Sequence, residues 1–120
     1  MRVVCVEPDK SSYEMEIDGS LESLQKAVGG YIEAIYPWED EAAIICNEEG
    51  KIAKLPPCRA LHDEEGDIYD IICGTFLVVG LSDENFDSLT DEQVVRYSRL
   101  FRTPECIINF GGTYVAIPAV

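Results

Sequence analysis

The stretch that most constrains the fold is residues 69–80 (YDIICGTFLVVG), the most apolar segment of the chain. A run this rich in aliphatic and aromatic side chains predicts the central strand of a sheet. Gly74, inside the run, predicts a bulge or a close approach of another backbone segment at that point. The chain is therefore expected to assemble its other strands around this one.

Shorter segments also have the composition of strands, because they are apolar or alternate apolar and charged residues. The clearest alternation is in YEMEI, where it predicts that Tyr13, Met15 and Ile17 point into the core. The segment AAIIC is apolar enough for a central position in a sheet. The six shorter predicted strands are residues 2–6, 13–17, 31–36, 42–46, 51–55 and 113–117.

Residues 47–62 combine a turn with a rigid segment. Asn47 and Gly50 tolerate the left-handed conformations of a hairpin turn, so residues 51–55 (KIAKL) are expected to return as a strand. Pro56-Pro57 cannot donate to a strand ladder and is expected to stop it. The remainder of the segment is then expected to be a loop.

Two helices are expected, the first of them short (SLESLQKAV). Ser20 can cap its start, and Gly29-Gly30 supplies the positive φ that ends it. Leu21, Leu24 and Val28 recur at helical spacing and predict a single apolar face.

The second helix is expected in TDEQVVRYSRLFR. Thr90 and Gln93 have capping-box spacing, and Pro104 ends the segment. Residues 82–89, just before it, are expected to form a helical turn. Because strands and helices do not alternate regularly, the sequence predicts a single α+β domain with a mostly antiparallel sheet of about six strands and two helices.

The charge balance argues against nucleic acid as a partner. The 120 residues include 9 basic and 23 acidic ones, and the formal net charge of −14 repels nucleic acid phosphates. We therefore expect no direct nucleic-acid binding.

We also expect no membrane span, since no apolar run reaches about 18 residues, and no signal peptide is recognised. The expected compartment is the cytoplasm.

Cysteine usage predicts reduced, structural thiols. Five cysteines with no CxxC pair fit neither a disulfide framework nor a closed zinc site. Three of them, Cys5, Cys46 and Cys73, lie in apolar strand-like runs and are expected to be small buried hydrophobes. The five are Cys5, Cys46, Cys58, Cys73 and Cys106.

Six of the nine basic residues fall in two clusters, which are Lys51, Lys54 and Arg59, and Arg96, Arg99 and Arg102. In so acidic a chain they can simply form surface ion pairs. Alternatively, one or both clusters hold a phosphate or carboxylate, which an arginine can bind in bidentate fashion. Arg59 is the first candidate, because it follows a rigid Pro-Pro turn.

Neutral and aromatic side chains could complete such an anion site. Asn47 and Thr75 could donate or accept hydrogen bonds, and Tyr31, Tyr36 and Trp38 offer rings on which a base could stack. The candidate ligand-binding residues are thus Arg59, Lys51, Lys54, Asn47, Thr75, Trp38, Arg96 and Arg99.

The sequence does not predict an enzyme, a cofactor or a metal site. Its single histidine, His62, could pair with Cys58 only if the residues between them were helical, and two ligands do not make a zinc site. No serine or cysteine lies in a nucleophile motif such as GxSxG. Gly29-Gly30 and Gly111-Gly112 lack the lysine and the spacing of a phosphate-binding loop.

Three runs resemble a known family. LQKAVGGYIEAI, IICNEEGKIAKLPPCRAL and DIICGTFLVVG are similar to small proteins of phages and conjugative elements that share the domain of unknown function DUF3846. The resemblance covers about residues 2–81, and the combination of VGGYIE, NEEGK and LPxxRAL carries it. The resemblance implies no established activity. It implies a biological setting, that of phages and conjugative elements, in which small non-enzymatic proteins often counter bacterial defence.

Two mechanisms compete in that setting, beside a plain accessory or structural role. One is sequestration of a small anionic ligand, such as a nucleotide immune signal, in a pocket of arginines and aromatic rings. The other is inhibition of a bacterial defence protein, a CRISPR or restriction enzyme, by carboxylates that imitate a phosphate backbone. The terminal strand, residues 113–117, pairs either within the chain or with a second subunit, so a homo-oligomer is one of the expected alternatives.

Overall fold

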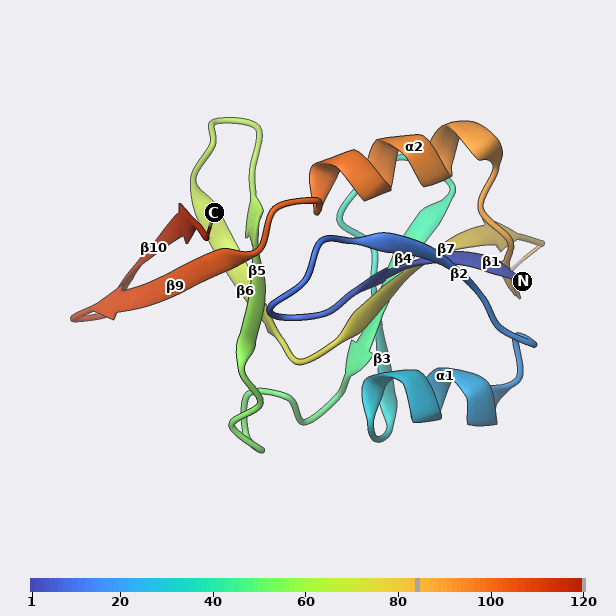
Figure 1. The fold of residues 1–120 in the computed structure, drawn as a ribbon, viewed down its shortest axis with the longest axis horizontal. Helices are drawn as coiled ribbons and strands as arrows, with labels where there is room; N and C mark the ends of the chain where they lie inside the picture. Colours follow the sequence, from blue (N-terminus) through green and yellow to red (C-terminus); the bar gives the residue numbers. More distant parts are fainter. Residues whose placement is uncertain (84, 120) are drawn as a thin grey trace.

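The computed structural model describes residues 1–83 and 85–119, which form one α+β domain with two helices and only antiparallel strand pairs. A central sheet has the order β2-β1-β7-β4-β3, with β8 also paired to β7. Two two-stranded sheets, β5–β6 and β9–β10, lie at one end of the molecule (Figure 1). The elements are β1 (Arg2–Val6), β2 (Tyr13–Glu16), α1 (Leu21–Val28), β3 (Ile32–Ile35), β4 (Ala42–Asn47), β5 (Pro57–His62), β6 (Ile68–Cys73), β7 (Phe76–Ser82), β8 (Asn85–Asp87), α2 (Asp91–Leu100), β9 (Glu105–Phe110) and β10 (Thr113–Pro118).

The central strand is β7, which pairs with β1 on one side and β4 on the other. Its residues alternate between two cores, because successive side chains of a strand point to opposite faces. Phe76 and Val78 belong to the core under α2, whereas Leu77 and Val79 belong to the core under α1. Burial on both faces explains why this part of the sequence is apolar without interruption.

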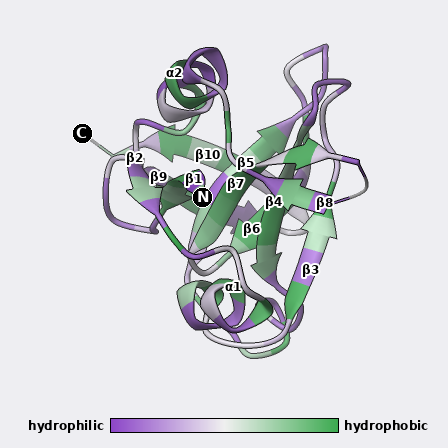
Figure 2. Cartoon of the chain, turned by 90° about the vertical axis from the view of Figure 1, so that its right-hand side faces the viewer, coloured by the Kyte–Doolittle hydropathy of each residue, from purple (hydrophilic) through white to green (hydrophobic). Residues whose placement is uncertain are grey.

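Each helix covers one face of this sheet (Figure 2). α1 begins after Ser20, whose side chain accepts from the Ser23 N–H, and ends at Gly29 with a φ of 79°. α2 begins after Thr90, which forms the expected reciprocal capping box with Gln93. The predicted starts of both helices, at Ser20 and Thr90, and the predicted end of α1, at Gly29, are thus confirmed.

The run 69–80 is two strands, and the prediction of a single strand is wrong. β6 ends at Cys73 and β7 starts at Phe76, with Gly74 between them at a φ of 84°. A Cβ on Gly74 would lie 2.7 Å from Cδ1 of Leu55. The Leu55 contact is with a side chain, but the Gly74 N–H donates to the Pro56 carbonyl at 2.8 Å, so another backbone segment does approach this glycine. Gly74 separates β6 in a side sheet from β7 in the central sheet.

Residues 51–55 are not a strand either. The N–H of Ala53 donates to the Glu49 carbonyl at 2.7 Å, and the N–H of Leu55 donates to the Gly50 carbonyl at 2.9 Å, so the chain coils there. The strand comes later, as β5, where a loop was expected. Pro57 is its first residue, a position where a missing N–H is tolerated.

Two smaller expectations also need correction, and one open alternative is resolved. Residues 82–89 contain the short strand β8 where a helical turn was expected, and Glu84 lies outside the described residues. Tyr13 is 41% exposed on the edge strand β2, although Met15 of the same strand packs on the core. β10 pairs within the chain, with β9, a strand that was not predicted.

In the described part of the chain, α1 has 8 residues and α2 has 10, and no helix is long and apolar enough to cross a membrane.

Candidate functional site

Arg59, the first candidate for a ligand contact, is 1% exposed. Its guanidinium donates only to main-chain carbonyls and the neighbouring thiol, and no carboxylate among the described residues forms an ion pair with it. Nε and Nη2 both reach the Phe101 carbonyl, at 3.1 and 3.0 Å. Nη2 also reaches the Lys10 carbonyl at 2.7 Å, and Nη1 reaches that of Cys58 at 2.9 Å.

These bonds give Arg59 a structural role. Phe101 is the C-cap of α2, where carbonyls lack helical partners and the helix dipole favours a cation. The Lys10 carbonyl belongs to the connection between β1 and β2. Arg59 therefore joins β5 to the end of α2 and to the β1–β2 connection, and its donors are occupied in this structure.

Asn47 and Lys51 are also held by the protein. The amide of Asn47 donates to the Val28 carbonyl at 3.2 Å and accepts from the Glu49 N–H at 2.8 Å. Nζ of Lys51 lies 2.6 Å from the Asp70 carboxylate, which raises the pKa of the lysine. Both line a hollow of about 260 Å³ that also contains Glu33, Glu48 and Asp70, so its charge opposes an anion.

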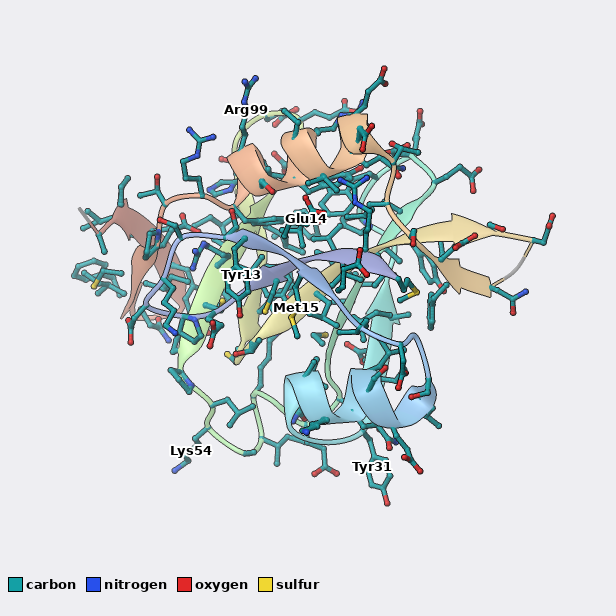
Figure 3. All side chains as sticks on the ribbon, turned by 45° about the vertical axis from the view of Figure 1, so that its right-hand side comes forward. Tyr13, Glu14, Met15, Tyr31, Lys54 and Arg99 are labelled. Carbon is teal, nitrogen blue, oxygen red and sulfur yellow. The ribbon has the colours of Figure 1, made fainter. Side chains whose placement is uncertain are left out.

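Lys54 and Thr75 join no common site with the other candidates. Lys54 is exposed, with a φ of 56° at the end of the coiled segment 51–54. Thr75 lies in the short link between β6 and β7. Figure 3 shows Lys54 and Tyr31 at one end of the molecule and Arg99 projecting from α2 at the other.

The structure brings together three candidates, Trp38, Arg96 and Arg99. They line an open, mainly apolar hollow of about 510 Å³ between the β3–β4 connection and α2. Its volume lies within the range of small-molecule sites, about 300–1,000 Å³. We call this hollow the Trp38 groove, and its lining residues are Trp38, Asp40, Arg96, Tyr97, Arg99 and Leu100.

A second hollow of about 230 Å³ adjoins the groove and shares Trp38, Arg99 and Leu100 with it. It continues toward β5 and the base of the β9–β10 hairpin, where His62 and Pro118 line it. The only histidine of the chain is therefore near the groove. The sequence could not place it there, because the position depends on β5 being a strand.

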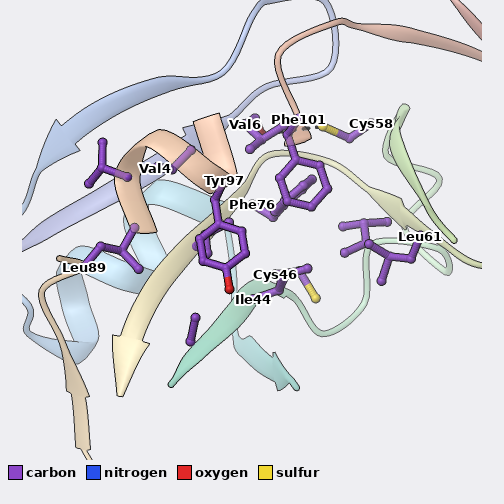
Figure 4. Packing of buried hydrophobic residues seen from close by; sticks show 14 residues of the cluster. Val4, Val6, Ile44, Cys46, Cys58, Leu61, Phe76, Leu89, Tyr97 and Phe101 are labelled. Atoms are coloured by element: carbon purple, nitrogen blue, oxygen red, sulfur yellow. Dashed lines mark hydrogen bonds between the residues drawn. The ribbon is translucent and has the colours of Figure 1, made fainter. Parts of the chain in front are cut away.

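Aromatic packing fixes the floor of the groove. The rings of Trp38 and Tyr97 lie 4.4 Å apart, and Trp38 lies 6.1 Å from Phe101. Phe101 meets Phe76 edge-on at 5.1 Å, which connects the groove to the core under α2 (Figure 4). Since Trp38 remains partly exposed while its neighbours are buried, it presents a rigid ring to the groove.

Asp40 organises the polar side of the groove. Its Oδ2 accepts from the Tyr97 hydroxyl at 2.6 Å and pairs with Nη1 of Arg96 at 2.7 Å. The amide of Gln93 donates to the same carboxylate at 3.2 Å. The Tyr97 hydrogen bond is the main cause of a lowered Asp40 pKa, whereas burial and Asp40 raise the pKa of Tyr97 to about 12.

The cations of the groove are not equivalent. Arg96 is neutralised by Asp40, and its guanidinium lies 5.9 Å from the centre of the Tyr97 ring. Arg99 is exposed and pairs with no carboxylate among the described residues. Arg102 is exposed but lies past the end of α2 and does not line the groove. Arg99 is therefore the cation best placed to meet an incoming anion.

Sequence reasoning missed Asp40, Tyr97 and Leu100 as parts of this site. Asp40 lies in the acidic run Glu39-Asp40-Glu41, and no local pattern shows that it faces α2. Tyr97 follows Gln93 and Val94 at helical spacing, which identifies the buried face of α2. The spacing does not show which segment packs against that face. The usable signals were Trp38 after a proline and the two arginines three residues apart.

Lowering the pH should weaken the fold as Asp40 takes up a proton. The folded-state pKa of Asp40 lies below its unfolded value of about 3.9, so the stabilisation is present above that value and lost as pH falls through the folded pKa. At neutral pH the free energy of unfolding of Asp40→Asn, measured in urea, should be roughly 1–2 kcal/mol lower than that of the wild type. Because the variant lacks the Asp40 carboxylate, its free energy of unfolding should fall less on acidification than that of the wild type. Glu39→Gln, at an exposed neighbour, is the control, and an identical acid profile for Asp40→Asn and wild type would contradict this role.

The fold and groove thus define a small α+β domain with an aromatic and basic hollow beside its second helix. A family model described as domain of unknown function (DUF3846) matches residues 1–102, so the chain belongs to this family. The match extends past Leu81 to the end of α2 and stops before the β9–β10 hairpin. No curated protein and no solved structure matches the chain.

Proposed function

We propose that the protein is a non-enzymatic binding protein that holds a small anion with a flat aromatic part, of the nucleotide class, in the Trp38 groove. The observation that carries this proposal is the exposed Arg99 guanidinium beside the partly exposed Trp38 ring. An arginine can bind a phosphate in bidentate fashion, and an indole offers a stacking surface for a base. The two features match the two halves of a nucleotide.

The charge of the rest of the chain supports a small ligand over a polymer. With a net charge of −14, the surface repels a long polyanion, whereas a single nucleotide needs only a local cation. The acidic hollow around Lys51 lacks such a free cation, because Lys51 is paired with Asp70. The Trp38 groove is therefore the better place for an anion.

The biological role that we propose is counter-defence, in which the protein sequesters a nucleotide immune signal in a bacterial host. The support is the resemblance to proteins of phages and conjugative elements. The net charge and the exposed carboxylates of residues 63–67 support the alternative, an acidic inhibitor of a CRISPR or restriction enzyme. Asp40 contributes little to that alternative, since Tyr97, Gln93 and Arg96 occupy its carboxylate.

A thermal-shift screen tests the ligand proposal. Cyclic mono- and dinucleotides, ADP-ribose and its cyclic forms are each added to the protein, and one of them is expected to raise the melting temperature. At a concentration of about 100 Kd, binding to the folded state adds about 2.7 kcal/mol of stability. Arg99→Ala should remove the shift without lowering the melting temperature of the free protein.

Arg102→Ala is the matched control, because Arg102 is also exposed at the end of α2 but does not line the groove. It should leave the ligand-induced shift unchanged. A shift that survives Arg99→Ala would place the ligand elsewhere. If no nucleotide in the panel changed the melting temperature, the sequestration proposal would be wrong and the acidic-inhibitor alternative would gain.

A further inference from the structure

The Trp38 groove continues into the second hollow, which lies between the end of α2 and the base of the β9–β10 hairpin. The two hollows meet at Trp38, Arg99 and Leu100, which line both of them. The second hollow has a volume of about 230 Å³, whereas complete small-molecule sites measure about 300–1,000 Å³. It therefore has the size for one part of a ligand whose remainder lies in the groove.

The walls that belong to the second hollow alone carry hydrogen-bonding groups. They include the carboxylate of Glu105, the hydroxyl of Thr103 and the imidazole of His62. Each of these groups can form a hydrogen bond with a hydroxyl of a ligand. The hollow thus adds hydrogen-bonding groups to the Trp38 ring and the Arg99 cation that it shares with the groove.

Glu105 is held in place at the wall of this hollow. β9 leaves the end of α2 and passes beside β5 (Figure 1), where Oε1 of Glu105 accepts from the Ala60 N–H at 3.0 Å. The N–H of Ala119 donates to the Pro104 carbonyl at 2.7 Å and closes the base of the hairpin. No cation in residues 1–83 and 85–119 pairs with the Glu105 carboxylate. The protein therefore orients this carboxylate through one oxygen and leaves the other, Oε2, as an acceptor for a ligand.

We propose that the second hollow is a sugar subsite, and that the ligand is a nucleotide with a second sugar linked beyond its phosphates, as in a nucleoside diphosphate sugar. This inference rests on the proposed binding of a nucleotide in the Trp38 groove. The base stacks on Trp38, a phosphate meets Arg99 where the two hollows join, and the second sugar lies against Glu105. Carboxylates accept from a ribose hydroxyl in the same way in dinucleotide-binding folds.

The charge of Glu105 selects a neutral, hydroxyl-bearing group for this hollow. A terminal phosphate would place a second negative charge beside the carboxylate, whereas a sugar is neutral and its hydroxyls donate to it. An apolar group would leave the Oε2 acceptor without a hydrogen-bond donor, which costs binding free energy. A sugar avoids both costs.

The hairpin supplies the carboxylate of this hollow. Glu105 and Pro118 are paired in the register of β9 and β10, and both line the hollow. They lie beyond residues 1–102, which the family model matches, whereas Trp38 and Arg99 lie within them. The matched domain thus carries the ring and the cation, and the hairpin adds the group that recognises the second sugar.

Isothermal titration calorimetry with two pairs of nucleotides, ADP-ribose with ADP and UDP-glucose with UDP, tests the sugar subsite. In at least one pair, the diphosphate sugar is expected to bind at least about tenfold more tightly than the diphosphate, because a hydrogen bond to a charged acceptor is a strong one. Glu105→Gln keeps a carbonyl oxygen for the Ala60 N–H but removes the charge, so it should reduce this preference to less than about threefold.

Glu22→Gln is the matched control, because it makes the same change in charge at an exposed residue of α1, on the opposite face of the sheet. It should leave the preference for the diphosphate sugar unchanged. The preference of the wild type is a test that needs no variant, so it holds even if Glu105→Gln lowers the stability of the fold.

The outcomes separate this inference from the proposed function. Equal affinity within both pairs, or a preference that Glu105→Gln leaves unchanged, would overturn the sugar subsite even where Arg99→Ala removed binding. Binding of a cyclic dinucleotide but of neither diphosphate sugar would also overturn the subsite and leave the groove as a nucleotide site. Binding that survived Arg99→Ala, or no binding of any nucleotide, would overturn the proposed function and the subsite together.

Discussion

Arg59→Met should lower the free energy of unfolding by about 3 kcal/mol, measured in urea, because it removes a buried donor group shared by several main-chain carbonyls. Methionine fills much of the same volume, so the loss reports hydrogen bonds more than a cavity. The Phe101 and Lys10 carbonyls would lose partners at 3.0 and 2.7 Å. The end of α2 and the β1–β2 connection should therefore loosen together.

Arg99→Met is the matched control, since Arg99 is exposed and its replacement should change stability by no more than about 0.5 kcal/mol. Amide hydrogen exchange adds a local readout, because Arg59→Met should speed exchange at the last turn of α2. Equal stability of the two variants would show that the Arg59 bonds do not hold these elements. A loss of ligand binding in Arg59→Met alone could reflect unfolding, so Arg99 is the residue with which to test the groove.

Much of the fold could be predicted from local sequence. β1, β4 and the start of α1 carry signals that belong to a few neighbouring residues, and their tertiary positions agree with them. The segment 51–62 could not be predicted in this way. Its strand β5 begins with a proline and is fixed by pairing with β6, which is a contact between distant residues.

The candidate site was predicted only in part, for a related reason. The sequence shows that Arg59 is a cation after a rigid turn, but it does not show that the end of α2 lies over it. Trp38 and Arg99 were both candidates, although 61 positions separate them, and only the β3–β4 connection folded onto α2 makes them neighbours. Residue type thus indicated which side chains could contact an anion, whereas burial determined whether each candidate is structural or open to a ligand.

The floor of the Trp38 groove gives the second large expected effect. Phe101 is 3% exposed and packs between Phe76 in the central sheet and Trp38 in the groove. Leu100, its neighbour in sequence, is 56% exposed at the rim of the same groove. Phe101 and Leu100 therefore allow the loss of a buried side chain to be compared with the loss of an exposed one at nearly the same place in the structure.

Phe101→Ala should lower the free energy of unfolding by about 3–5 kcal/mol, because truncating a buried phenylalanine leaves a cavity that its neighbours fill only in part. Leu100→Ala should lower it by no more than about 0.5 kcal/mol. Urea unfolding measures both, and Trp38 fluorescence of the folded variants reports whether the ring has lost its support. Equal losses for the two variants would mean that α2 does not bury Phe101 against the sheet. If Phe101→Ala instead left the Trp38 fluorescence unchanged, Tyr97 alone would hold the Trp38 ring. The groove would then be independent of the core beneath it.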